Sequence, residues 1–98
     1  MKLKLHPEAR TDLKEGRAFY RSRSPLAAVS FAQEIDTAMT RIVEAPSRYP
    51  EGEHGTREFV LPWRFPYTVV YRVRDNAVVV IAVAHHSKEP GYWRHRLS

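Results

Sequence analysis

The chain of 98 residues contains no cysteine. This absence excludes a disulfide framework, a thiolate metal site and a cysteine nucleophile, and it is typical of proteins from reducing compartments. No apolar run approaches the length that spans a membrane, and the first residues lack the long apolar core of a signal peptide. We therefore expect a cytoplasmic protein without membrane association.

Acidic residues are scarce relative to basic ones. The chain has 11 Asp and Glu against 16 Lys and Arg, which gives a formal net charge of +5 and a pI of about 9.9. A basic balance favours anionic partners such as nucleic acid, the ribosome or an acidic protein. Arginines gather in the second half of the chain, at Arg57, Arg64, Arg72, Arg74, Arg94 and Arg96.

The composition indicates neither disorder nor several domains. Hydrophobic residues make up 43% and charged residues 28% of the chain, which is ordinary for a globular protein. A chain of this length can bury one modest core. We expect residues 1–98 to form a single domain.

The first half of the chain predicts a short strand followed by two helices. Leu3 and Leu5 alternate with polar residues, as in a strand with one buried face. Ser24 and Pro25 suit the N-cap and first position of a second helix, so they separate two helices that form a hairpin. The apolar faces of these helices are Ala9, Leu13, Gly16 and Tyr20, and then Ala28, Phe31, Ile35, Ala38, Met39 and Ile42.

The second half predicts a loop over 46–55 and three strands, over 57–61, 67–74 and 77–84. Asp75 and Asn76 tolerate positive φ and form a two-residue hairpin turn between the last two strands. The last strand is apolar on both faces, which indicates an interior strand covered on both sides. The order β-α-α-β-β-β predicts an α+β fold with a helical hairpin packed on a small, mainly antiparallel sheet.

Short motifs follow one another in a specific order along nearly the whole chain. They are Ser24-Pro25-x-Ala27-Ala28, Phe31-x-x-x-Ile35-Asp36, Ala45-Pro46-x-x-Tyr49-Pro50, Gly55-x-Arg57, Phe65-Pro66-Tyr67-x-Val69-x-Tyr71, Ala82-Val83-x-His85 and Pro90-Gly91-Tyr92-Trp93-x-x-Arg96. In these motifs the chain resembles the ParE/RelE superfamily, the toxins of type II toxin–antitoxin pairs. The resemblance implies the same fold and a cognate antitoxin that wraps the toxin in a hetero-oligomer.

The resemblance leaves two kinds of target open, because both classes share the fold. ParE-like members bind and poison DNA gyrase, whereas RelE-like members cut messenger RNA on the ribosome. We favour the first class, in which the protein is not an enzyme. A third alternative is a non-toxic interaction module, since Ser87-Lys88-Glu89 departs from the arginine-rich run that is usual in the family.

The RelE-like alternative requires a residue set that this chain carries only in part. RNA cleavage needs a base or positioning group on the ribose, cations for the phosphate and an acid for the leaving oxygen. The resemblance places Tyr92 at the position of the catalytic tyrosine, and His86 and Thr68 at positions of arginines. Pro62 and Trp63 stand where lysines are usual. The alternative catalytic set is therefore Tyr92, His86 and Lys88.

Candidate contacts to the target or the antitoxin are polar and cationic residues of the C-terminal segment and of the strands: Arg57, Arg64, Arg72, His86, Lys88, Tyr92, Arg94 and Arg96. Trp93 is better explained as an anchor for the tail. His85 and His86 are neighbours on a strand and point to opposite faces, so they do not share a metal. We expect neither a metal nor a cofactor.

Overall fold

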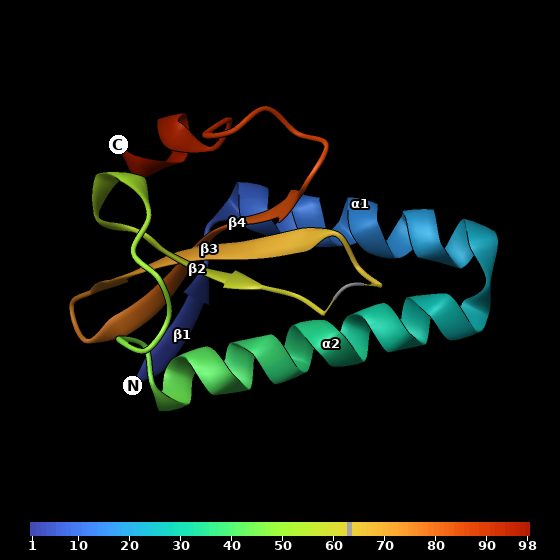
Figure 1. Cartoon of the computed structure of the whole chain (residues 1–98), viewed down its shortest axis with the longest axis horizontal. Coiled ribbons are helices and arrows are strands. Elements are labelled where there is room, and N and C mark those ends of the chain that lie inside the picture. Colours follow the sequence, from blue (N-terminus) through green and yellow to red (C-terminus); the bar gives the residue numbers. More distant parts are fainter. Residues whose placement is uncertain (63) are drawn as a thin grey trace.

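The computed structural model of the chain describes residues 1–62 and 64–98. The assignments made above for Trp63 lie outside these residues. The elements follow in the predicted order, as β1 (Lys2–Leu5), α1 (Pro7–Arg23), α2 (Pro25–Glu44), β2 (Arg57–Val60), β3 (Tyr67–Arg74) and β4 (Ala77–His85) (Figure 1). Two short 3-10 turns complete the chain, Glu53–Gly55 in the predicted loop and Arg94–Leu97 in the tail.

The helical hairpin forms for the local reasons that the sequence indicates. Pro7 opens α1 and Pro25 opens α2, and the Ser24 hydroxyl accepts a hydrogen bond from the Ala27 backbone N–H at 3.4 Å. Gly16 lets the two helices and the sheet approach closely, because a Cβ there would lie 2.9 Å from the Phe31 ring. The turn between the helices projects beyond the strands at one end of the molecule (Figure 1).

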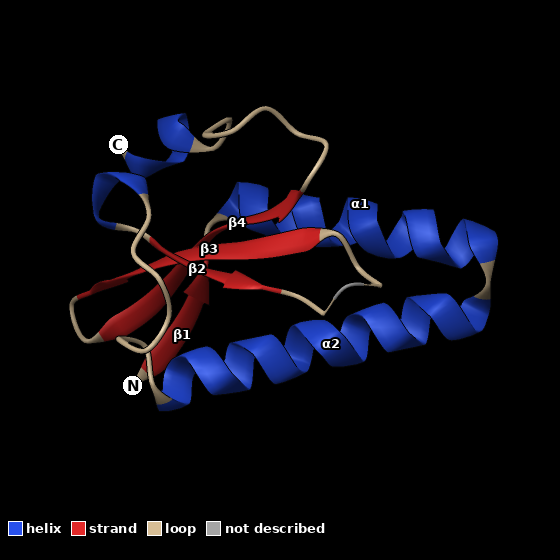
Figure 2. Ribbon diagram, viewed as in Figure 1, coloured by secondary structure: helices blue, strands red, loops and turns tan. Residues whose placement is uncertain are grey.

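The sheet has the order β1-β4-β3-β2 (Figure 2). β1 runs parallel to β4, and the other two pairs are antiparallel. The predicted hairpin turn is confirmed, since Asp75 and Asn76 have φ of 51° and 58°. The prediction that the last strand is interior is confirmed as well, because β4 lies between β1 and β3.

A β-bulge in β4 determines which side chains face which layer. Tyr71 pairs with Val80 and Val70 with Ala82, so Ile81 is an extra residue without a partner on β3. Bulges shift the alternation of side chains along a strand. As a result the consecutive residues Ile81 and Ala82 both face away from the helices.

Both faces of the sheet therefore carry buried hydrophobic side chains. The helices cover one face, in a core of Ala9, Phe31, Ile35, Ala38, Met39, Ile42, Leu61, Phe65, Tyr67, Val69, Tyr71, Val78, Val80 and Val83. Part of the other face is covered by the C-terminal tail, residues 86–98, through a smaller cluster of Val70, Ile81, Ala82 and Trp93. The tail thus provides the second cover that the apolar pattern of β4 predicts.

Candidate binding site

The C-terminal tail leaves β4 and folds back across the sheet (Figure 1). Trp93 is only 6% exposed and packs with Val70, Ile81 and Ala82, which confirms its predicted role as an anchor. Gly91 turns the chain just before this anchor, with φ of 76°. Glycine suits this position because positive φ is disfavoured for other residues.

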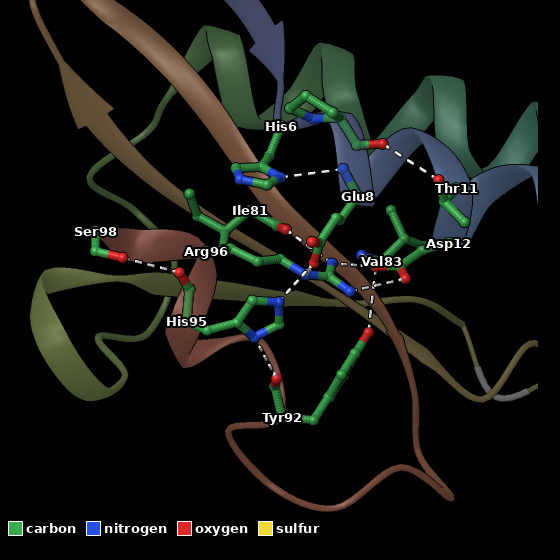
Figure 3. Close-up of polar contacts among 11 residues, drawn as sticks. His6, Glu8, Thr11, Asp12, Ile81, Val83, Tyr92, His95, Arg96 and Ser98 are labelled. Atoms are coloured by element: carbon green, nitrogen blue, oxygen red, sulfur yellow. Dashed lines mark hydrogen bonds and ion pairs between the residues drawn. The ribbon is translucent and has the colours of Figure 1, made fainter.

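Arg96 fastens the end of the tail to α1 (Figure 3). The residue is 8% exposed, and its guanidinium donates to both carboxylate oxygens of Asp12, at 2.7 and 3.2 Å. It also donates to Glu8 Oε2 at 2.9 Å and to the Ile81 carbonyl at 3.1 Å. A planar guanidinium with five N–H donors can satisfy such a set, whereas an ammonium group cannot reproduce it.

This cluster completes the hydrogen bonding of β4 where β1 no longer accompanies it. The β1–β4 ladder ends at Leu5 and Val80. Beyond that point the Val83 N–H donates to Asp12 Oδ2 at 3.0 Å, and the Ile81 carbonyl accepts from Arg96. Because unpaired buried backbone groups are costly, Asp12 and Arg96 stabilise both the strand and the tail.

An exposed hydrogen bond extends the cluster toward solvent. His95 Nε2 lies 2.7 Å from Glu8 Oε2. This hydrogen bond, together with the charges of His95 and Arg96, lowers the pKa of Glu8 below its ordinary value despite partial desolvation. The carboxylate is therefore held in its charged form, beside the first turn of α1, where negative charge is favoured.

The Tyr92 hydroxyl is committed to the same cluster. It donates to Asp12 Oδ2 at 3.2 Å, and the Arg96 guanidinium and the Lys88 ammonium lie 5.1 and 5.5 Å from the centre of the tyrosine ring. Burial raises the pKa of Tyr92 strongly, and the negative charge of Asp12 raises it further. This hydroxyl is a donor that resists ionisation.

A groove of about 470 Å³ lies between the tail, the open end of the sheet and the loop before β2. Thr68 and His86 line the groove and contact each other, with Thr68 Oγ1 and His86 Nε2 2.9 Å apart. Four carboxylates contribute to its lining: Glu51, Glu53, Glu58 and Glu89. Arg57 pairs with Glu51 and Arg94 with Glu53, whereas Glu58 and Glu89 form no ion pair within residues 1–62 and 64–98.

Known proteins share this arrangement of elements. The family model of the ParE toxin of the type II toxin–antitoxin system, parDE, matches residues 3–90. The chain belongs to the ParE toxin family. The motifs indicated the wider ParE/RelE superfamily, and the family model assigns the chain to its ParE branch.

Individual relatives agree with this assignment. The chain is 29% identical over 91 residues to Toxin ParE2 of Mycobacterium tuberculosis, from both the CDC 1551 / Oshkosh and the H37Rv strains, with 91% of this chain and 85% of the relative covered. The structure of the chromosomal ParDE TA system from P. aeruginosa has a chain with the same fold. Its TM-score is 0.75 at 21% identity, covering 87% of this chain and 95% of that one.

Four of the eight candidate contact residues of this ParE-family chain form side-chain hydrogen bonds within the fold. Arg57 donates to the Tyr49 carbonyl at 2.7 Å and pairs with Glu51. Arg72 reaches the Leu97 carbonyl at 3.3 Å, and burial lowers its pKa. Tyr92 and Arg96 belong to the Asp12 cluster.

The other four candidates are exposed, but the structure does not bring all of them together. His86 and Lys88 line the groove, and Arg94 extends from the tail beside it to pair with Glu53. Arg64 is in the turn before β3, where its guanidinium lies 5.6 Å from the centre of the Phe65 ring. His85 packs against the Tyr67 ring at 4.9 Å while His86 contacts Thr68, so the two rings point apart as predicted.

The sequence reasoning missed Asp12 and Glu8. A signal for Asp12 was present, because it follows Ala9 by three residues and precedes Gly16 by four, on the buried side of a helix. A carboxylate in that position requires a partner. The partner is 84 positions away, which helical spacing does not reveal.

In the part of the chain that the structure describes, no group of three or more His, Cys, Asp or Glu side chains is arranged to hold a metal ion. None of the described helices is both long and apolar enough to cross a membrane.

Proposed function

We propose that this ParE-family chain is a toxin that a cognate antitoxin neutralises and that inhibits DNA gyrase by binding, without cleaving RNA. Family membership supports a toxin of a type II pair. The solved relative is part of a ParDE toxin–antitoxin system, which supports an antitoxin as partner. The gyrase target follows from the resemblance to the ParE class, and the chemistry of the tail supports binding over catalysis.

The observation that carries this choice is the hydrogen bond from the Tyr92 hydroxyl to Asp12. A tyrosine that activates a ribose hydroxyl must accept a proton or lie free to orient the reacting oxygen. Here the hydroxyl donates to a carboxylate, and burial raises its pKa well above the ordinary value. Both features oppose the role that an RNA-cleaving mechanism gives to this position.

The charge of the groove supports the same conclusion. A phosphodiester in the groove would meet Glu58 and Glu89, which have no ion-pair partner among the described residues. The basic groups there are Lys88, His85 and His86, while Arg94 is already paired with Glu53. Like charges at close range disfavour binding and leave the transition state without the cations that phosphoryl chemistry requires. Thr68 offers no charge at the position of an expected arginine.

The contacts to antitoxin and target are proposed to be the exposed members of the predicted set. They are Arg64, His86, Lys88 and Arg94. His86 and Lys88 line the groove, and Arg94 pairs with Glu53 beside it. Arg57, Arg72, Tyr92 and Arg96 are assigned to holding the loop and the tail in place. Exposed charges at the edge of an interface act mainly on partner selection and association rate.

The deciding experiment is induction of the chain alone in bacteria, with thymidine and methionine incorporation followed together. An early loss of thymidine incorporation, and inhibition of supercoiling by the purified chain with purified gyrase, is the expected result. An early loss of methionine incorporation with cut messenger RNA would assign the chain to the RNA-cleaving class instead. Unchanged incorporation of both would identify a non-toxic interaction module.

The antitoxin is tested by co-expression with the short reading frame next to the toxin gene. We expect its product to restore growth and to co-purify with the toxin. The proposed contacts are tested with a toxin variant that carries Lys88→Glu and Arg94→Glu, compared with the unchanged toxin. These reversals are expected to weaken co-purification, and equal recovery of both toxins would remove Lys88 and Arg94 from the proposed interface.

A further inference from the structure

Helix α1 separates its charges onto two flanks. The acidic residues Glu8 and Asp12 face the tail, where they pair with Arg96. Four basic residues follow one another at spacings of four, three and four residues: Arg10, Lys14, Arg17 and Arg21. At 3.6 residues per turn these four lie within about 60° of one another around the helix, in a row about 16 Å long. We call them the α1 cation row.

No carboxylate among residues 1–62 and 64–98 forms an ion pair with the cation row. All four side chains are exposed, and none forms an ion pair or a side-chain hydrogen bond within residues 1–62 and 64–98. Asp36 of α2 lines a small cavity together with Arg17 but is not paired with it. In contrast, Arg57, Arg94 and Arg96 are each paired with a carboxylate.

The alignment of the row is unfavourable for the isolated chain. Like charges three or four residues apart on a helix destabilise it by about 0.2–0.5 kcal/mol per pair. The row contains three such pairs in succession, Arg10–Lys14, Lys14–Arg17 and Arg17–Arg21. A bound polyanion would remove this repulsion, so the row has a physical reason to bind one.

The surroundings of the row favour phosphates over a protein surface. On α1 itself its exposed neighbours on one side are the small residues Thr11, Ala18 and Ser22, and the Thr11 and Ser22 hydroxyls contact backbone carbonyls of α1. Protein interfaces need an apolar, often aromatic centre. The exposed aromatic of α1, Phe19, lies nine residues from Arg10, on the opposite side of the helix.

We propose that the α1 cation row binds the phosphate backbone of double-stranded nucleic acid without reading its sequence. Straight helices with aligned Lys and Arg contact phosphates in this way, and these contacts supply most of the affinity of non-specific complexes. Single strands are less suitable because their binding relies on exposed aromatics for base stacking, which this flank lacks. The groove contains no residue of α1, so both surfaces can be occupied together.

The proposal is tested by fluorescence anisotropy with labelled duplexes of random sequence, DNA in one arm and RNA in the other, over a range of salt concentrations. For four phosphate contacts we expect a dissociation constant of about 10⁻⁴ to 10⁻⁶ M near physiological salt, and a slope of log K against log salt of about −3.6. Binding of either duplex with such a slope supports phosphate recognition.

The double variant Lys14→Gln/Arg17→Gln is expected to reduce the magnitude of that slope by about 1.8, because two contacts are lost. The control Arg48→Gln/Arg74→Gln removes the same charge from exposed residues outside the row, and it is expected to keep the slope. Circular dichroism verifies that both variants are folded.

Four results would overturn the proposal. The first is the absence of saturable duplex binding, and the second is an equal loss of affinity in the row and control variants. The third is competition by polyglutamate as effective as competition by unlabelled duplex, which would assign the row to an acidic protein. Tighter binding of single strands than of duplexes would likewise contradict the choice of a double-stranded ligand.

Discussion

The guanidinium of Arg96 and the carboxylate of Asp12 form a two-point ion pair that joins the last turn of the chain to its first helix, across 84 positions of sequence. The side chains are 6% and 11% exposed. Because Asp12 also accepts hydrogen bonds from the Val83 N–H and the Tyr92 hydroxyl, one carboxylate organises a strand, a helix and the tail. The groove has the tail as one wall, so this pair determines its shape.

Asp12→Ala is expected to destabilise the chain by about 3 kcal/mol, since it leaves Glu8 as the remaining carboxylate partner of the buried Arg96 guanidinium and removes the acceptor of the Val83 N–H. Urea unfolding followed by circular dichroism measures the free energy of unfolding. The control is Asp36→Ala, which removes an exposed carboxylate without an ion pair among the described residues and should change stability by less than about 0.5 kcal/mol. Equal effects of the two substitutions would contradict the role assigned to Asp12.

Gly16→Ala is expected to lower stability although alanine favours helices by about 1 kcal/mol over glycine. The added Cβ would lie 2.9 and 3.0 Å from two carbons of the buried Phe31 ring, and overpacking of this kind costs about 1–3 kcal/mol. Thermal unfolding should therefore show a lower Tm. Gly16→Ala should lower the Tm less when it is introduced into a Phe31→Leu protein than when it is introduced into the unchanged chain, because the clashing ring is then absent. A higher Tm for Gly16→Ala in the unchanged chain would show that helix propensity outweighs the overpacking.

Local signals explain why most of the fold could be predicted from the sequence. Ser24 and Pro25 determine the helix boundary through their own capping and ring geometry. Asp75 and Asn76 determine the hairpin turn because they tolerate positive φ. The apolar period of α2 likewise identifies its buried face without knowledge of the sheet. Each of these features depends on residues within a few positions of one another.

The candidate site was harder to predict because it depends on which charges find partners. The sequence predicted Arg57, Arg72 and Arg96 as contacts to the target or the antitoxin, and in the structure each of them forms hydrogen bonds within the fold. The α1 cation row was visible as a spacing of basic residues. That none of its four side chains forms an ion pair within residues 1–62 and 64–98 became apparent only from the positions of the side chains in the structure.

Alkaline pH is expected to destabilise the chain through Tyr67. Burial raises the pKa of Tyr67 from 10.0 to about 12, so the unfolded chain loses this proton more readily than the folded one. The stabilisation is complete below pH 10 and is lost as the pH rises from 10 through 12, by at most about 2.7 kcal/mol for a shift of two units. Tyr67→Phe should flatten that part of the stability curve, and a parallel decline in both proteins would refute the assignment.

Tyr92→Phe tests the absence of catalysis directly. The substitution removes the hydroxyl and its hydrogen bond to Asp12, at a cost of about 1 kcal/mol in stability, and retains the ring beside Arg96. Growth inhibition at matched protein levels is expected to be unchanged, because binding to the target does not use the hydroxyl. A catalytic tyrosine would instead lose about 10²–10⁴-fold in activity. Tyr49→Phe, away from the tail, is the matched control, and a loss of toxicity confined to Tyr92→Phe in a folded protein would restore the RNA-cleaving alternative.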